Sequence, residues 1–158
     1  VVERLKKKRK DFELVMIGSI DSLRLRAESM VARMQLQDVV KVLPGMPSEE
    51  IAAWMNASVC FLLFSNYENL PCVMIEAFAS GLPVISSTVG GVPDHLDGSR
   101  GMLVAPGDED ALMQAIDNML NHIGDYDRES IAKYAKNTFS MEVVGKQISD
   151  IYGRIHHD

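Results

Sequence analysis

Cysteine is scarce in this sequence. Cys60 and Cys72 are its two cysteines, and neither has partners at a metal-ligand spacing. Two cysteines are too few for the disulfide framework that stabilises many small secreted domains. The chain therefore fits a reducing compartment.

Long apolar runs are also missing. No stretch approaches the roughly 20 apolar residues that a transmembrane helix requires, and the first residues lack a signal-peptide pattern. We therefore expect a cytoplasmic protein. The sequence opens at Val1, without a methionine and within a predicted helix, so we also expect a fragment of a longer protein.

Positive charge is in deficit. Sixteen basic residues face 22 acidic ones, which gives a net charge of -6. Such a chain repels a nucleic-acid backbone, so we expect no nucleic-acid partner. The exception is the basic segment 4–10. Its simpler interpretation is the solvated end of a helix, where cations interact favourably with the helix dipole. The alternative is peripheral contact with the anionic inner face of the membrane in the full-length protein.

The composition is that of one globular domain. Apolar residues make up 47% of the chain and charged residues 24%, as in ordinary soluble proteins. There is no internal repeat, low-complexity stretch or Pro/Gly-rich linker. We expect residues 1–158 to form a single domain.

The order of apolar segments predicts an α/β fold. Short continuous apolar runs, typical of strands covered on both faces, alternate with helical segments. The strands are predicted at residues 12–17, 39–43, 59–64, 84–86 and 102–104, and the helices between them at residues 22–34, 48–56 and 71–80. This alternation predicts a Rossmann-like parallel sheet with helices on both faces. Two further helices, with apolar stripes over residues 111–120 and 144–155, are expected to pack on the sheet.

The loops after the strands are the expected place for chemistry. In doubly wound sheets, ligands bind outside the carboxyl ends of the strands. These loops lie at residues 18–20, 44–47, 65–70 and 87–91.

Glu76 is the one charged residue in the predicted helix 71–80. Pro71 suits the first turn of this helix, and Gly81 suits a left-handed cap after it. A lone carboxylate on an apolar helix needs a donor, and the neighbouring strands offer no lysine or arginine. Ribose hydroxyls are one source of donors. Two interpretations stay open: Glu76 binds a nucleotide, or it belongs to a structural network.

Glu68 lies in the loop before this helix. On its own it is typical of a solvated loop acid. However, the first-turn amides of the helix point into the same space and attract anions. A diphosphate bound there would place its sugar beside Glu68.

These features form a recognisable motif. Residues 64–91 are FSNYENLPCVMIEAFASGLPVISSTVGG, in which two glutamates are separated by seven residues and are followed by A-x-A-x-G-x-P-V-I and G-G-V-P. The segment resembles the donor-binding, C-terminal half of family 4 of the GT-B glycosyltransferases. D-V-V-K-V-L-P-G and P-G-D-E-D-A-L are similar to flanking segments of that family, so the resemblance covers nearly the whole chain.

The resemblance implies a role for each matching position. Glu76 would hold the ribose hydroxyls, and Glu68 would be the catalytic acid that contacts the transferred sugar. The backbone facing sugar and phosphates would be that of Asn69, Leu70, Pro71 and Cys72. Pro44, Gly45 and Met46 would border the base, and Gly18 would allow a close approach of the backbone.

The resemblance also implies an activity. It is retaining hexosyl transfer from a nucleotide sugar to a glycan or lipid-linked acceptor in polysaccharide biosynthesis, without metal or cofactor. The acceptor would bind to an N-terminal half that is absent here. The family's first strand, with the arginine and lysine that clamp the diphosphate, is not among the 158 residues. We therefore expect this fragment to bind donor weakly and to be inactive alone.

Two alternatives remain. A GT-B-like sugar-nucleotide epimerase or hydrolase would share the ribose site but needs further acids and histidines in its loops. A non-catalytic, flavodoxin-like interaction module would instead tie Glu76 to an internal partner and bind no nucleotide.

Overall fold

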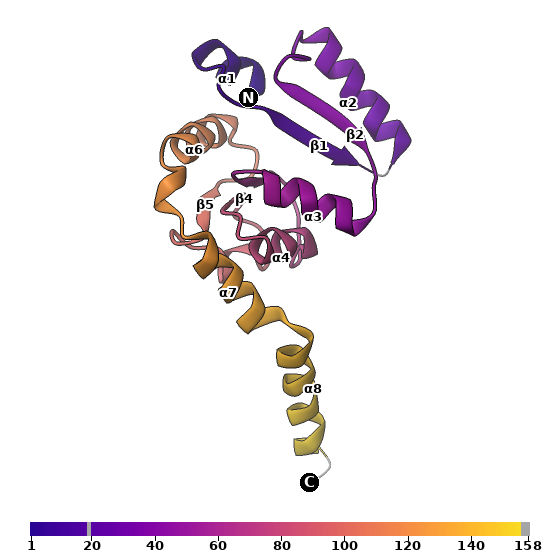
Figure 1. Cartoon of the computed structure of the whole chain (residues 1–158), viewed down its shortest axis with the longest axis vertical. Coiled ribbons are helices and arrows are strands. Elements are labelled where there is room, and N and C mark those ends of the chain that lie inside the picture. The colour runs from indigo at the N-terminus through magenta and orange to yellow at the C-terminus, as the bar shows by residue number, and fades with distance from the viewer. Residues whose placement is uncertain (19, 156–158) are drawn as a thin grey trace.

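Five parallel strands form the centre of the computed structural model, which describes residues 1–18 and 20–155 (Figure 1). In one sheet β1 (Leu14–Gly18) pairs with β2 (Val40–Pro44), with Gly18 opposite Pro44. The second sheet has the order β3-β4-β5, formed by β3 (Phe61–Leu63), β4 (Val84–Ser87) and β5 (Gly101–Val104). The five predicted strands and their parallel direction are confirmed.

The division into two sheets differs from the single sheet that the sequence predicts. Among the described residues, no strand pairing joins β1 and β2 to β3, β4 and β5. Neither β1 nor β3 contains a charged residue or proline, the residues that natural sheets often place on exposed edges.

The helices between the strands are α2 (Asp21–Arg33), α3 (Ser48–Ala57) and α4 (Cys72–Ala79), close to their predicted limits. Helix α4 buries Met74, Ala77 and Phe78 completely, and these side chains pack with Val84 and Val92 in the main hydrophobic core. The short helix α5 (Val92–His95) follows β4. This packing fixes α4 relative to β4, and with it the loop that precedes α4.

The predicted cap of α4 is present. Gly81 has a φ of +70°, the Gly81 amide donates to the Phe78 carbonyl at 2.8 Å, and the Leu82 amide donates to the Ala77 carbonyl at 2.9 Å. These two bonds form a Schellman motif, which satisfies carbonyls that the end of the helix leaves free.

Three helices and a short 3₁₀ turn complete the chain: α6 (Glu109–Asn121), η1 (Ile123–Asp125), α7 (Arg128–Phe139) and α8 (Met141–Ile155). The predicted stripe of α6 is confirmed, since Leu112, Ala115 and Met119 are buried in a core with Ile85 and Val104 of the sheet. Helix α7 was not predicted and packs on α4.

Helix α8 does not pack on the sheet, so that prediction is wrong. It extends away from the strands (Figure 1), and Ile148, Ile151 and Tyr152 of its apolar stripe are 50%, 56% and 63% exposed. The reason is that α7 already covers α4, which leaves α8 in contact with the end of α7.

The basic segment forms α1 (Val2–Lys8) and the residues that follow it. Lys6 pairs with Asp38 at 2.6 Å, Lys8 pairs with Asp117 at 2.6 Å, and Arg9 also reaches Asp117 at 3.3 Å. These cations are held by acids of distant elements rather than solvated alone. None of the helices that the structure describes is both long and apolar enough to cross a membrane.

Candidate functional site

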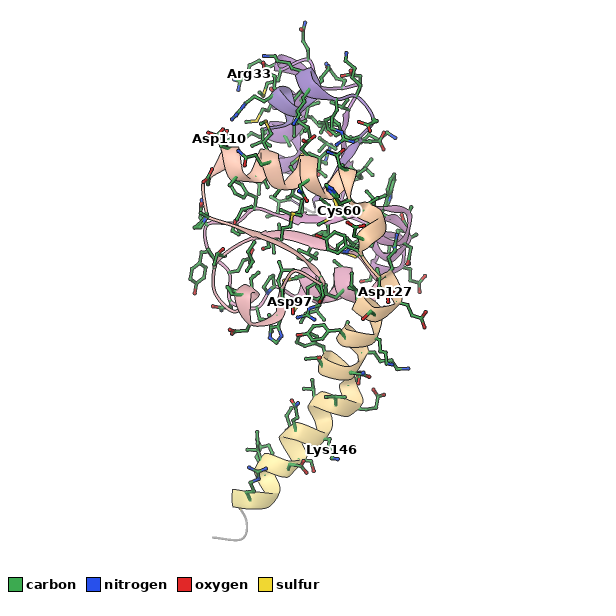
Figure 2. The ribbon with its side chains drawn as sticks, turned by 90° about the vertical axis from the view of Figure 1, so that its left-hand side faces the viewer. Arg33, Cys60, Asp97, Asp110, Asp127 and Lys146 are labelled. Atoms are coloured by element: carbon green, nitrogen blue, oxygen red, sulfur yellow. The ribbon has the colours of Figure 1, made fainter. Side chains whose placement is uncertain are left out.

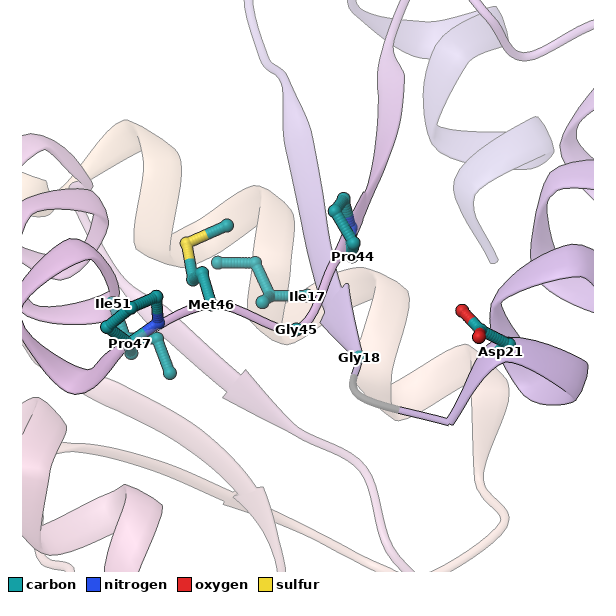
Figure 3. Close-up of a pocket in the computed structure, with 8 residues that line it drawn as sticks. All are labelled: Ile17, Gly18, Asp21, Pro44, Gly45, Met46, Pro47 and Ile51. Carbon is teal, nitrogen blue, oxygen red and sulfur yellow. The ribbon is translucent and has the colours of Figure 1, made fainter.

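A pocket of about 560 Å³ lies at the carboxyl ends of β1 and β2 (Figure 3). Four of the predicted residues line it: Gly18, Pro44, Gly45 and Met46. They meet because Gly18 ends β1 directly opposite Pro44, the last residue of β2. Apart from its chain neighbours, no heavy atom of the described residues lies within 4 Å of the Cβ position that a side chain at Gly18 would take. The space beside this glycine is therefore open, as close approach to a ligand requires.

The pocket is mainly apolar. Ile17, Pro47 and Ile51 complete its walls, and Asp21 is the one charged residue among those that line it. Figure 3 shows Ile17 and Met46 side by side, with Asp21 apart from them at the start of α2. Pro47 belongs to the predicted loop 44–47, whereas Ile17, Asp21 and Ile51 were not predicted to line a site. Asp21 had a usable signal, because an acid opening the helix after the first strand lies at the carboxyl edge of a parallel sheet.

The second group of predicted residues lies in the loop between β3 and α4. Glu68 is half-buried there, whereas Asn69 and Leu70 are exposed and Pro71 is buried. Pro71 is the N-cap of α4 and provides no side-chain hydrogen bond. Among the described residues, the amides of residues 65–70 and those of Cys72 and Val73 have no acceptor. Together with the helix dipole, this row of donors suits an anion.

Glu76 has different surroundings from those that the sequence predicts. Its side chain is exposed, because α4 turns the opposite face, with Met74, Ala77 and Phe78, into the core. Water can therefore solvate the carboxylate, and the premise that burial forces it to find a donor is wrong. It also forms no ion pair with the residues that the structure describes, so the internal partner expected of an interaction module is absent from that part of the chain.

The structure does not join the two groups in one pocket. Glu68, Asn69, Leu70, Pro71, Cys72 and Glu76 are not among the residues that line the pocket at β1 and β2. The groups instead follow β1 and β3, which belong to different sheets. No lysine or arginine lines the pocket within the described part of the chain. At the start of α4, amides and the helix dipole are the groups that would attract an anion.

A turn at Gly90 and Gly91, within the predicted loop 87–91, supports the acidic loop, which we define as residues 65–70. The Gly91 amide donates to the Asn69 carbonyl at 2.6 Å, and Gly90 has a φ of +54°. In the sequence, the two adjacent glycines of G-G-V-P were the signal that could have indicated this turn. A left-handed backbone and close contact with the loop explain glycine at position 90, whereas Gly91 has an ordinary φ of -83°.

The two cysteines are in different environments. Burial raises the pKa of the Cys60 thiol to about 11, and Figure 2 shows Cys60 beneath α6. Cys72 is exposed at the first position of α4. Over residues 1–18 and 20–155, no three His, Cys, Asp or Glu side chains gather as metal ligands would.

Comparison with known proteins places these features in context. Residues 1–122 match the family described as Glycosyl transferases group 1. The chain is 29% identical over 159 residues to the MMP alpha-(1->4)-mannosyltransferase of Mycolicibacterium hassiacum, which covers 96% of the chain and 37% of that protein.

Solved structures show the same fold. Sucrose-phosphate synthase from Thermosynechococcus elongatus superposes with a TM-score of 0.85 and 26% identity, covering 98% of the chain and 41% of that structure. Anabaena Alr3699/HepE in complex with UDP-glucose gives a TM-score of 0.81 at 18% identity, covering 97% of the chain and 44% of that structure. The chain thus spans less than half the length of these proteins, and it matches their Rossmann-like half.

Proposed function

Because the chain belongs to the Glycosyl transferases group 1 family, we propose that it is the donor-binding half of a nucleotide-sugar-dependent glycosyltransferase. One observation carries the proposal. The loop from Glu68 to Cys72 presents a row of amides without acceptors among the described residues, with Glu68 in the loop itself and Glu76 on α4. Amides suit a diphosphate, and carboxylates suit the hydroxyls of ribose and sugar.

Each part of the donor has a place in this proposal. The base lies in the pocket beside Gly18 and the loop of Pro44, Gly45 and Met46, whose apolar walls suit a flat ring. The diphosphate lies on the amides of Asn69, Leu70 and Cys72 next to Pro71. Glu76, solvated in the free chain, accepts the two ribose hydroxyls in place of water, and Glu68 accepts hydroxyls of the transferred sugar.

The proposed reaction is hexosyl transfer with retention at the anomeric carbon, as in family 4. An acceptor glycan or lipid-linked sugar attacks from the face that the diphosphate leaves. This chain's amides and helix dipole stabilise the departing charge, and no metal ion or cofactor takes part. The acceptor is held by polypeptide beyond this chain. The basic segment is not part of the proposal, because its cations already pair with Asp38 and Asp117.

The stereochemistry can be tested on the native polypeptide that carries this chain. We expect proton NMR to show nucleoside diphosphate release and a product with the donor's anomeric configuration. Glu68→Gln keeps the size of the side chain and removes its charge, so it should reduce kcat by about 10² or more if Glu68 contacts the transition state. A product with the opposite anomer would refute retention. No release from any UDP, GDP or ADP sugar, tested with glycan and lipid-linked acceptors, would refute the activity.

A further inference from the structure

The acidic loop is supported by the turn at Gly90 and Gly91 of the same chain. Between residues 65 and 70, one backbone hydrogen bond links the loop to another segment within the described residues, and it runs from the Gly91 amide to the Asn69 carbonyl at 2.6 Å. The loop therefore has little support of its own, and its position depends on the turn.

The turn itself is firmly anchored on both sides. Before it, the Thr88 amide and hydroxyl both donate to the Val104 carbonyl, at 2.8 and 3.0 Å. After it, Val92 is fully buried in the main core against α4. The turn is therefore the fixed partner, and the loop from Glu68 to Asn69 is the part that it positions.

Contact between the two is too close for any side chain at Gly90. A Cβ there would lie 2.0 Å from the Glu68 carbonyl oxygen and 2.5 Å from the Asn69 carbonyl oxygen. At Gly91 the corresponding distance to the Asn69 carbonyl oxygen is 3.3 Å, which a small shift relieves. The backbone of Glu68 and Asn69 thus lies directly against the bare Cα of Gly90.

We propose that Gly90 and Gly91 are positioning residues that set the Glu68–Asn69 backbone and thereby the recognition of the sugar part of the donor. This inference rests on the proposed function. Glu76 is on α4, whose buried face packs in the main core. Displacement of the loop therefore moves Glu68, which faces the sugar, and the Asn69 amide, one of several that face the diphosphate, whereas Glu76 and the Cys72 amide stay on α4. The turn therefore contributes more to the binding of a nucleotide sugar than to the binding of the bare nucleoside diphosphate.

Gly107 provides a matched control for Gly90. It has a φ of +76°, so alanine there meets the same unfavourable backbone region, but no heavy atom lies within 4 Å of the Cβ position. Gly90→Ala and Gly107→Ala therefore share the conformational penalty, and Gly90→Ala adds displacement of the loop. Gly91→Ala supplies a milder variant on the same turn, which serves if Gly90→Ala does not fold.

The experiment is calorimetric titration of the native polypeptide with a nucleotide sugar and with its nucleoside diphosphate. We expect Gly90→Ala to lower the affinity for the nucleotide sugar by about tenfold or more, as the loss of a hydrogen bond to a charged group does, and to lower the affinity for the nucleoside diphosphate by less. Gly91→Ala should change the ratio of the two affinities, nucleotide sugar to nucleoside diphosphate, in the same direction but by less. Gly107→Ala should leave this ratio unchanged. The inference would be overturned if Gly90→Ala lowered the affinity for both ligands equally. It would also be overturned if Gly107→Ala changed the ratio of the two affinities as much as Gly90→Ala does.

Amide NMR of the ligand-free protein separates this inference from the proposed function. Gly90→Ala should shift the amide signals of Glu68, Asn69 and Leu70 more than Gly107→Ala does. If the wild type binds no nucleotide sugar, the proposed function fails, and the role of the turn in sugar recognition fails with it. Unchanged loop amides in Gly90→Ala would refute the positioning of the loop even where donor binding is observed.

Discussion

Single residues show where sequence reasoning stops. Glu68 and Glu76 were identified by their spacing around a helix start, and the structure places them there. The predicted burial of Glu76 was wrong, because a helix with one polar residue can turn that residue to solvent and bury the opposite face. Composition reveals the polar residue but not the direction in which it points. Glu76 therefore remains a predicted ribose ligand on motif and position, not on burial.

The two cysteines give a direct prediction at this scale. The thiolate is the reactive form, and burial raises the pKa of the Cys60 thiol to about 11, whereas Cys72 is exposed. At pH 7.5, iodoacetamide should modify Cys72 at least about tenfold faster than Cys60, as peptide mass spectrometry can measure. In urea the two rates should converge. Equal rates in the folded protein would contradict the partly buried position of Cys60.

At the scale of elements, the sequence predicts best where local chemistry decides. The strands and the first three crossover helices were found because apolar runs, Pro71 and Gly81 mark them locally. Helix α7 was missed because exposed polar residues dominate it, although Asp127 caps its start by accepting from the amides of Glu129 and Ser130. The apolar stripe of α8 was predicted correctly. The spacing of apolar residues does not, however, indicate which surface the stripe packs against.

Arg128 joins three helices and supports a second prediction. Its guanidinium donates to the carbonyls of Ser58, Asn56 and Ser80, at the ends of α3 and α4. Arg128→Ala leaves these carbonyls to water and should lower the free energy of unfolding by about 1 kcal/mol, a modest value because the side chain is exposed. Urea denaturation measures this change. Lys133→Ala, an exposed position on the same helix, is the control, and equal effects of the two substitutions would contradict the role of Arg128.

At the scale of the whole molecule, the sequence could not predict the long-range pairs. Lys8 and Asp117 are 109 positions apart, and nothing local indicates that α1 lies against α6. The same limit applies to the break between the sheets. Periodicity identifies strands but not the neighbour on each edge, so the separation of the pocket from the acidic loop became visible only in the structure.

The ion pairs of α1 predict sensitivity to acid. Hydrogen bonds from Lys6, Lys8 and Arg9 lower the pKa values of Asp38, Asp117 and Asp11, the last from 3.8 to about 2. A carboxylate with a lower pKa in the folded state binds fewer protons there than in the unfolded chain. Its contribution to stability is therefore present above about pH 4 and is lost as the pH falls toward about 2.

Urea denaturation between pH 6 and pH 2.5 tests this expectation. Asp117→Asn should reduce the acid-dependent loss of stability, because it removes one of the groups whose pKa is lowered. Asp150→Asn on α8 is the control, since Asp150 forms no ion pair with the residues that the structure describes. The same pH dependence in both variants would show that the α1 pairs do not contribute to stability.

The most direct test of the central claim is calorimetric titration of the native polypeptide with UDP, GDP and ADP and with their sugars. The account predicts that at least one nucleotide binds and that Glu76→Ala weakens it by about tenfold or more, since each hydrogen bond to a charged group contributes about 1.5 to 3 kcal/mol. Glu129→Ala, which removes the same charge from an exposed site on α7, should leave affinity unchanged. Failure of every nucleotide to bind, or unchanged binding in Glu76→Ala, would contradict the account.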